Sequence, residues 1–291
     1  MRNKQLIFVH SGWGAKIKET EEGPAEYKKF LEQAKPQLLQ DSIDVKALSS
    51  YVKSPDLIGK QSLPFVSDVA KKLAEVTEQT IVENKFPIII GGDHSIAIGS
   101  WAGIIHAQKA AEKFGLIWID AHMDAHRFDD SPSKAYHGMP EAVLLGHGEP
   151  DLVNIKDYTP KIKPEHLVVL GVRSYEVEEE AFLKKLGVRI FYNKEIKERG
   201  FHDCFLEALE IVNKNTKGFG VSIDLDVFDP MFAPGVGSPE ANGLFPTEVL
   251  LMLKRLRANE QFKAFEIVEY NPRRDLNNRT LQLLHQIVES I

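Results

Sequence analysis

Short apolar runs alternate along this chain with longer amphipathic segments. The runs predict strands, because apolar side chains on both faces are typical of a strand buried in a parallel sheet; they lie at 6–9, 43–48, 86–90, 115–119, 167–172, 188–192, 221–225 and 265–268. The segments between them predict helices, at about 24–40, 67–83, 96–113, 178–186, 203–213, 247–257 and 277–289. This alternation predicts βαβ units, and hence an α/β fold whose sheet is mainly parallel.

The chain shows no internal repeat, low-complexity tract or linker that would divide it. Its 291 residues suit one large α/β domain, so we expect a single domain over residues 1–291. The longest irregular stretches are 125–140 and 230–246. Long loops in a compact domain usually carry function, so these two are candidate site loops.

Polar residues follow the predicted strand Gly115–Ile119 directly. Asp120, His122 and Asp124 have a spacing of two, so on a strand that continued outward their side chains would project to one face. Buried carboxylates beside an imidazole need a cation to offset their desolvation. The alternative is a helix start that Asp120 caps, with the other two side chains in solvent.

Two more predicted strands end in the same kind of residue. Asp224 and Asp226 follow the run at 221–225, and Asp93 and His94 follow the run at 86–90. Because ligands of open α/β sheets gather at the carboxyl ends of the strands, we expect these groups to meet. The sequence therefore predicts a metal site.

The donor set indicates which metal chemistry to expect. Six candidate ligands, four of them carboxylates, exceed what one tetrahedral ion can use: His94, Asp120, His122, Asp124, Asp224 and Asp226. Two divalent ions would balance four carboxylates, with Asp120 and Asp224 as bridges. Oxygen and imidazole ligands without sulfur favour manganese over zinc. Two ions roughly 3.5–4 Å apart can activate a shared water, which predicts hydrolysis.

Composition excludes several classes of partner. The formal net charge of −6 and the absence of a Lys/Arg-rich block argue against nucleic acid. Only four apolar residues precede His10, which predicts neither a secretory signal nor a membrane span. The single Cys204 excludes an internal disulfide and a thiolate metal cage, and we expect it to be a packing residue. We therefore expect a cytoplasmic protein.

Three motifs in the chain resemble the metal motifs of the ureohydrolase family in order and spacing, at 91–95, 120–124 and 222–230. Further similar motifs lie at 21–24, 137–140, 233–239 and 269–272, so the resemblance covers almost the whole chain. The family contains arginases, agmatinases, guanidinobutyrases and formiminoglutamases. The resemblance implies an arginase-like three-layer α/β/α open sheet, a dimanganese centre and assembly into trimers or hexamers.

The resemblance also implies a reaction and its residues. Hydroxide that bridges the metals attacks an amidine or guanidinium carbon and releases urea, or formamide in formiminoglutamases, with an amine. One ion would be held by His94, Asp120, Asp124 and Asp224, and the other by Asp120, His122, Asp224 and Asp226. Asp124 would take the proton of the hydroxide.

Two more residues match roles in the family. Glu269 matches the residue that receives the guanidinium group, and a carboxylate suits that delocalised cation. His137 matches the histidine that passes a proton to the departing amine, for which an imidazole has a suitable pKa. The alternatives are a surface glutamate before a turn and a solvated loop histidine.

The loop before His137 resembles the arginase version, so L-arginine is the expected substrate, giving L-ornithine and urea. Ser133 matches a residue that contacts the α-carboxylate. There are departures: His126 replaces the usual asparagine, Lys134-Ala135 replaces a Gly-Asn pair, and Glu176 replaces an aspartate that reads the α-amino group. The alternatives within the family are 4-guanidinobutyrate, agmatine and formiminoglutamate.

Arg127 and Lys134 suggest a positive cavity mouth that favours a substrate with a distal carboxylate; their alternative is a solvated charged loop.

Two other classes of protein are alternatives to a ureohydrolase. A single-zinc deacylase would not need the extra ligands His94, Asp124 and Asp226. A non-catalytic metal-binding protein would not need His137 or Glu269.

Overall fold

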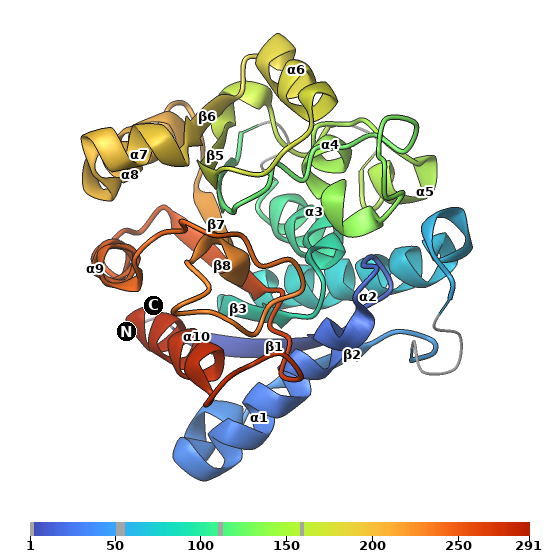
Figure 1. The fold of residues 1–291 in the computed structure, drawn as a ribbon. Helices are drawn as coiled ribbons and strands as arrows, with labels where there is room; N and C mark the ends of the chain where they lie inside the picture. Colours follow the sequence, from blue (N-terminus) through green and yellow to red (C-terminus); the bar gives the residue numbers. More distant parts are fainter. Residues whose placement is uncertain (1–2, 51–55, 110–112, 158–159) are drawn as a thin grey trace.

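The eight strands form one sheet in the computed structural model, which describes residues 3–50, 56–109, 113–157 and 160–291 (Figure 1). Their order is β2-β1-β3-β8-β7-β4-β5-β6, and every neighbouring pair is parallel. The strands are β1 (Lys4–His10), β2 (Ile43–Lys46), β3 (Phe86–Gly91), β4 (Gly115–Ile119), β5 (Leu167–Val172), β6 (Arg189–Tyr192), β7 (Phe219–Asp224) and β8 (Phe262–Val268).

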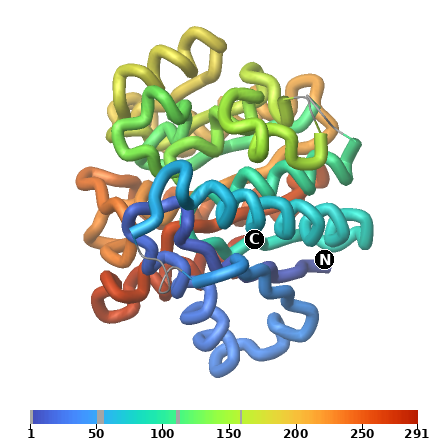
Figure 2. Tube along the Cα trace, turned by 90° about the vertical axis from the view of Figure 1, so that its right-hand side faces the viewer, coloured from blue at the N-terminus to red at the C-terminus, as the bar shows by residue number. Residues whose placement is uncertain are grey.

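Helices cover both faces of this sheet. One core contains side chains from α1 (Gly23–Ala34), α7 (Asn193–Arg199), α8 (Phe201–Asn213), α9 (Pro246–Leu256) and α10 (Arg279–Ser290). The core on the other face contains side chains from α2 (Leu63–Val82), α3 (Ala97–Ala107), α4 (Pro140–Leu144) and α6 (Val177–Leu186). Figure 2 shows α2 running across the front of the molecule. The expected three-layer arrangement is confirmed.

Successive residues of a strand supply the two cores in turn. In β4, Ile117 and Ile119 pack in the first core, whereas Leu116 and Trp118 pack in the second. All five residues of this strand are buried. A strand that is apolar on both faces can only be stable between two layers of helices, as the sequence pattern predicted.

Several expected elements end earlier than the pattern suggested, among them the strand expected over 43–48, which ends at Lys46. The helix expected over 24–40 ends at Ala34, because Pro36 disfavours helical geometry at Lys35, whose φ is −151°. The strand that was to carry Asp120, His122 and Asp124 ends at Ile119, and Asp124 has a left-handed φ of 47°. The three side chains therefore do not share the face of an extended strand.

Three short helices lie where the pattern predicted none: α4, α5 (Pro150–Val153) and α7. Helices of a few residues complete too few turns to show an apolar period. The helix expected over 96–113 is α3, which ends earlier, at Ala107; residues 110–112 lie outside the described part. Among the described residues, no helix is both long and apolar enough to cross a membrane.

The strand order brings the candidate residues to one edge. Strands β3, β8, β7, β4 and β5 are consecutive neighbours in the sheet, and their carboxyl ends lie together. His94 and Glu269 follow β3 and β8, while Asp224 closes β7 and Asp120 follows β4. Residues far apart in the chain thus meet through the topology of the sheet.

Candidate metal centre and substrate cavity

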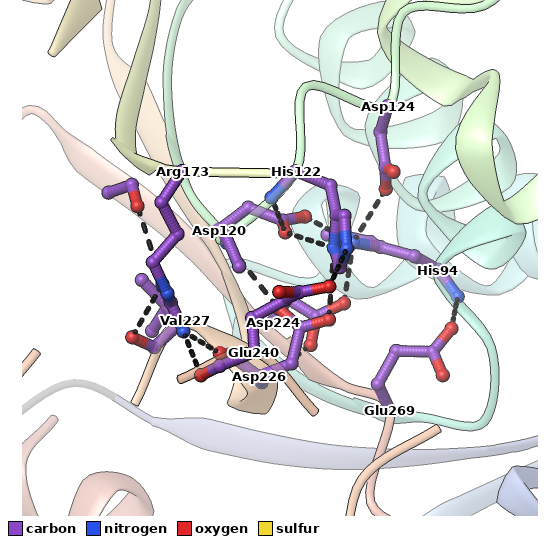
Figure 3. Close-up of polar contacts among 12 residues, drawn as sticks. His94, Asp120, His122, Asp124, Arg173, Asp224, Asp226, Val227, Glu240 and Glu269 are labelled. Atoms are coloured by element: carbon purple, nitrogen blue, oxygen red, sulfur yellow. Dashed lines mark hydrogen bonds and ion pairs between the residues drawn. The ribbon is translucent and has the colours of Figure 1, made fainter. Parts of the chain in front are cut away.

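His94 is the centre of one ligand cluster, which we call the His94 half. Its Nδ1 lies 3.1 Å from Asp124 Oδ2, 3.2 Å from Asp120 Oδ2 and 3.3 Å from Asp224 Oδ2. The imidazole is buried and stacks on Trp118 with 4.0 Å between ring centroids. Three carboxylates therefore converge on one nitrogen in the interior (Figure 3).

His122 is the centre of a second cluster, the His122 half. Its Nδ1 lies 3.1 Å from Asp226 Oδ2 and 3.5 Å from Asp120 Oδ1. Its side chain is 25% exposed, against 1% for His94. On the outer side, Nε2 lies 3.7 Å from Glu240 Oε1, which is too long for a hydrogen bond. Asp120 belongs to both clusters and joins the two halves.

Backbone amides hold these carboxylates in place. Asp224 Oδ1 accepts a hydrogen bond from the N–H of Asp226, Asp226 Oδ1 from Ala121, and Asp120 Oδ1 from His122. For Asp224 and Asp226 this leaves Oδ2 directed at a histidine. The turns that follow the strands thus orient these side chains. The sequence pattern instead predicts that a continued strand orients them.

The donor set fits a pair of cations. His94 Nδ1 is buried and has no hydrogen-bond partner, although carboxylate oxygens surround it. Burial and repulsion from neighbouring carboxylates raise the pKa of Asp124 to about 6 and hold that of Asp224 well above its usual range. A buried group of like charges is stable only when cations compensate them.

Arg173, just beyond β5, ties the loop after β7 to this edge. Its guanidinium donates to the carbonyl oxygens of Asp226 at 2.7 Å, Val227 at 3.2 Å and Glu240 at 2.9 Å (Figure 3). A guanidinium offers five donors in a fixed plane, so one side chain can hold several turns of backbone. The backbone of Asp226 is thereby held in place by Arg173.

Glu269 and His137 form a pair beside the His94 half. Glu269 Oε1 accepts from the backbone N–H of His94 at 2.9 Å and lies 3.2 Å from His137 Nδ1. Glu269 is buried and has a left-handed φ of 68°. Burial lowers the pKa of His137, but the Glu269 carboxylate raises it more, and the pKa reaches about 9. Neither residue is the solvated surface group of the alternative interpretation.

These groups open on a cavity of about 230 Å³. Its inner wall includes residues of both halves and the Glu269–His137 pair, and its outer wall includes His126, Ser133 and Glu176. His126 Nε2 lies 2.9 Å from Glu176 Oε2 and 3.3 Å from Glu179 Oε2. All of the candidate site residues therefore lie on this cavity or within its metal clusters.

Sequence reasoning missed Glu179, which also lines the cavity. It accepts from the backbone N–H groups of Ala125 and Glu176 and forms a capping box with Glu176 at the start of α6. The acid–x–x–acid spacing before a helix was a signal that could have identified it.

The expected positive mouth is wrong, because neither Arg127 nor Lys134 lines the cavity. The Arg127 guanidinium pairs with Asp130, and Lys134 Nζ donates to the carbonyl oxygens of Phe128 and Asp129. Both cations serve the folding of their own loop. The charge that does reach the outer wall belongs to Glu176, since burial raises the pKa of Glu179 to about 8.

Fold and site together define a class: an α/β protein with a paired-cation site at the carboxyl edge of a parallel sheet. The model of the arginase family matches residues 11–291. The chain belongs to the arginase family and is a hydrolase of the ureohydrolase type.

Named relatives agree with this assignment. The arginase of Bacillus caldovelox is 39% identical over 231 residues, which cover 79% of this chain and 76% of that protein. The crystal structure of arginase from Bacillus subtilis superimposes with a TM-score of 0.87 at 34% identity and covers 99% of this chain and 98% of its own. Entamoeba histolytica arginase in complex with L-ornithine gives 0.88 at 26% identity, with 100% and 98% coverage.

Proposed function

We propose that this protein hydrolyses L-arginine to L-ornithine and urea with two manganese ions per chain. The observation that carries the proposal is the meeting, on one cavity, of two ligand clusters that share Asp120 with the Glu269–His137 pair. Relatives named arginase and a related structure that contains L-ornithine support the choice of substrate.

The metal assignment follows from the donor atoms. His94, Asp120, Asp124 and Asp224 would hold one ion, and Asp120, His122, Asp224 and Asp226 the other. Carboxylate and imidazole ligands without sulfur suit Mn²⁺. A pair of divalent ions supplies a water-derived nucleophile at neutral pH.

The chain's own residues then orient the substrate and move protons. The buried Glu269 carboxylate receives the guanidinium group and holds its carbon at the inner wall. A carboxylate oxygen of Asp124 accepts the proton that the nucleophile loses. His137, protonated beside Glu269, gives a proton to the nitrogen that leaves as the amine.

The outer wall supports a substrate with a distal ammonium group. Glu176 places a carboxylate there, and His126 lies between it and the buried carboxyl group of Glu179. A positively charged group is favoured opposite carboxylates, whereas a lone distal carboxylate is repelled. With Ser133 as a donor to the α-carboxylate, L-arginine fits this wall better than 4-guanidinobutyrate.

A urea-release assay with Mn²⁺ tests the proposal. The expected order of kcat/KM is L-arginine, then agmatine, then 4-guanidinobutyrate. A clear preference for agmatine or 4-guanidinobutyrate would contradict the assignment of L-arginine. Formamide instead of urea, released from formiminoglutamate, would show the other branch of the family.

Two further expectations accompany this proposal. A single-zinc deacylase would bind one ion per chain and release no urea, so metal stoichiometry separates it from a two-ion ureohydrolase. Self-association into trimers or hexamers stays a prediction from the family resemblance, and light scattering of the purified protein checks it.

A further inference from the structure

A buried polar chain runs from the ring nitrogen of His94 that lies opposite the ligand cluster. His94 Nε2 lies 3.0 Å from Ser222 Oγ, and Ser222 Oγ donates to Glu266 Oε1 at 2.9 Å. The indole N–H of Trp101 donates to the same carboxyl oxygen at 3.1 Å. We call these four residues the His94 relay; each is buried, with 0% of its surface exposed.

The chemistry of the donors fixes the direction of the relay. An indole N–H only donates, so Glu266 Oε1 is an acceptor. Ser222 has one hydroxyl hydrogen and uses it on that oxygen, so its oxygen must accept from His94 Nε2–H. The proton of His94 therefore lies on Nε2. A cation in the ligand cluster would therefore meet the lone pair of Nδ1, the atom that faces Asp120, Asp124 and Asp224.

The sheet is built to hold this relay. Ser222 of β7 and Glu266 of β8 are direct neighbours in the parallel register. Trp101 reaches them because residue 220 is glycine: a Cβ there would lie 2.1 Å from the indole ring. A carboxyl group between β7, β8 and α3 is costly to bury, so its presence indicates a role beyond packing.

We propose that Glu266 is a positioning residue which, through Ser222, fixes the tautomer and orientation of His94 and thereby sets the affinity of the ion in the His94 half. The inference rests on the proposed two-ion site. Residues behind a metal-binding histidine typically change metal affinity about 10- to 100-fold when they are removed. Among the described residues, none gives the His122 ring comparable support, since Glu240 lies 3.7 Å from its Nε2. The relay should therefore affect one ion and not the other.

Calorimetric titration of the apo-protein with Mn²⁺ tests this inference. The wild type should bind two ions. Ser222→Ala, which removes only one hydroxyl, should lower the affinity for one ion about 10- to 100-fold and leave the affinity for the other unchanged. Glu266→Ala should do the same. Glu266→Gln keeps an amide oxygen as the acceptor for Ser222 and Trp101, and its affinities should lie closer to those of the wild type.

Thr80→Val is the matched control, because it also removes one buried hydroxyl, bonded to Gln5 on β1 away from His94. It should leave both affinities unchanged. Three outcomes would overturn this inference and leave the proposed function standing. They are wild-type affinities in Ser222→Ala, equally weakened binding of both ions in that variant, or the same weakening in Thr80→Val. A wild type that binds fewer than two ions would overturn the proposed function as well. If Glu266→Ala does not fold, Ser222→Ala and Glu266→Gln still decide.

Discussion

The two halves of the metal centre are built differently, although both present a histidine to carboxylates that include Asp120. His94 is buried, stacks on Trp118 and is backed by hydrogen bonds that continue to Glu266. His122 is 25% exposed and lies on the cavity wall, with Glu240 beyond hydrogen-bond distance. The core therefore preorganises one candidate ion site, whereas the other depends on loops at the cavity.

The residue that joins the halves should have the largest effect. Asp120→Ala removes the carboxylate common to both clusters, so the protein should bind both ions more weakly. Losing several kcal/mol of metal-based stabilisation corresponds to a fall in activity of more than about 10³-fold. Metal analysis and urea release check this, with circular dichroism as the control for folding. Retention of two tightly bound ions would show that Asp120 is not shared.

Glu269→Gln should have the next largest effect on activity, because it removes a buried charge without changing the shape of the side chain. The amide oxygen can still accept from the His94 N–H, so both ions should remain bound. Leaving a guanidinium group without its partner costs about 2–5 kcal/mol, or roughly 30- to 4000-fold in kcat/KM for L-arginine. A variant that loses an ion along with its activity would assign Glu269 to the metal centre instead.

His137→Asn should lower kcat by about 10²-fold or more, as expected for loss of a general acid. The pKa of His137 is raised to about 9, so its protonated form persists below that pH and is lost as pH rises through it. The wild-type rate should therefore fall on the alkaline side, and the variant should lack that limb. An unchanged pH profile of kcat would exclude His137 as the proton donor.

Glu240→Gln should have the smallest effect, and it tests the contrast between the halves directly. An exposed pair at 3.7 Å contributes about 0–1 kcal/mol, so Mn²⁺ affinity should change less than about fivefold. The same titration applied to Ser222→Ala should show a much larger change. Comparable effects of the two substitutions would remove the distinction between the halves.

Much of the fold and the grouping of the candidate metal ligands could be predicted from sequence, for a physical reason. Strands that are apolar on both faces, such as β4 and β5, identify a covered parallel sheet, and polar residues at the carboxyl ends of its strands identify its site edge. The local geometry of the ligands differs from the pattern's prediction. Asp120, His122 and Asp124 converge through a turn with a left-handed residue, not along a strand.

The hydrophobic pattern of the sequence does not predict contacts between elements that are distant in the chain. Glu266 lies inside the apolar strand β8, and only the register with β7 reveals that it meets Ser222. The pairing of Arg127 with Asp130, by contrast, is a local contact three residues apart, and the charge pattern of the loop could have indicated it. Short helices such as α7 need tertiary contacts, because so few turns carry no apolar period.

Urea release from L-arginine, measured while the number of Mn²⁺ ions bound per chain is counted in the same samples, tests the two-ion centre most directly. A two-ion centre requires that activity appears as the second ion binds and reaches its maximum at two ions per chain. Full activity at one ion per chain, or no urea from a chain that holds two, would contradict it.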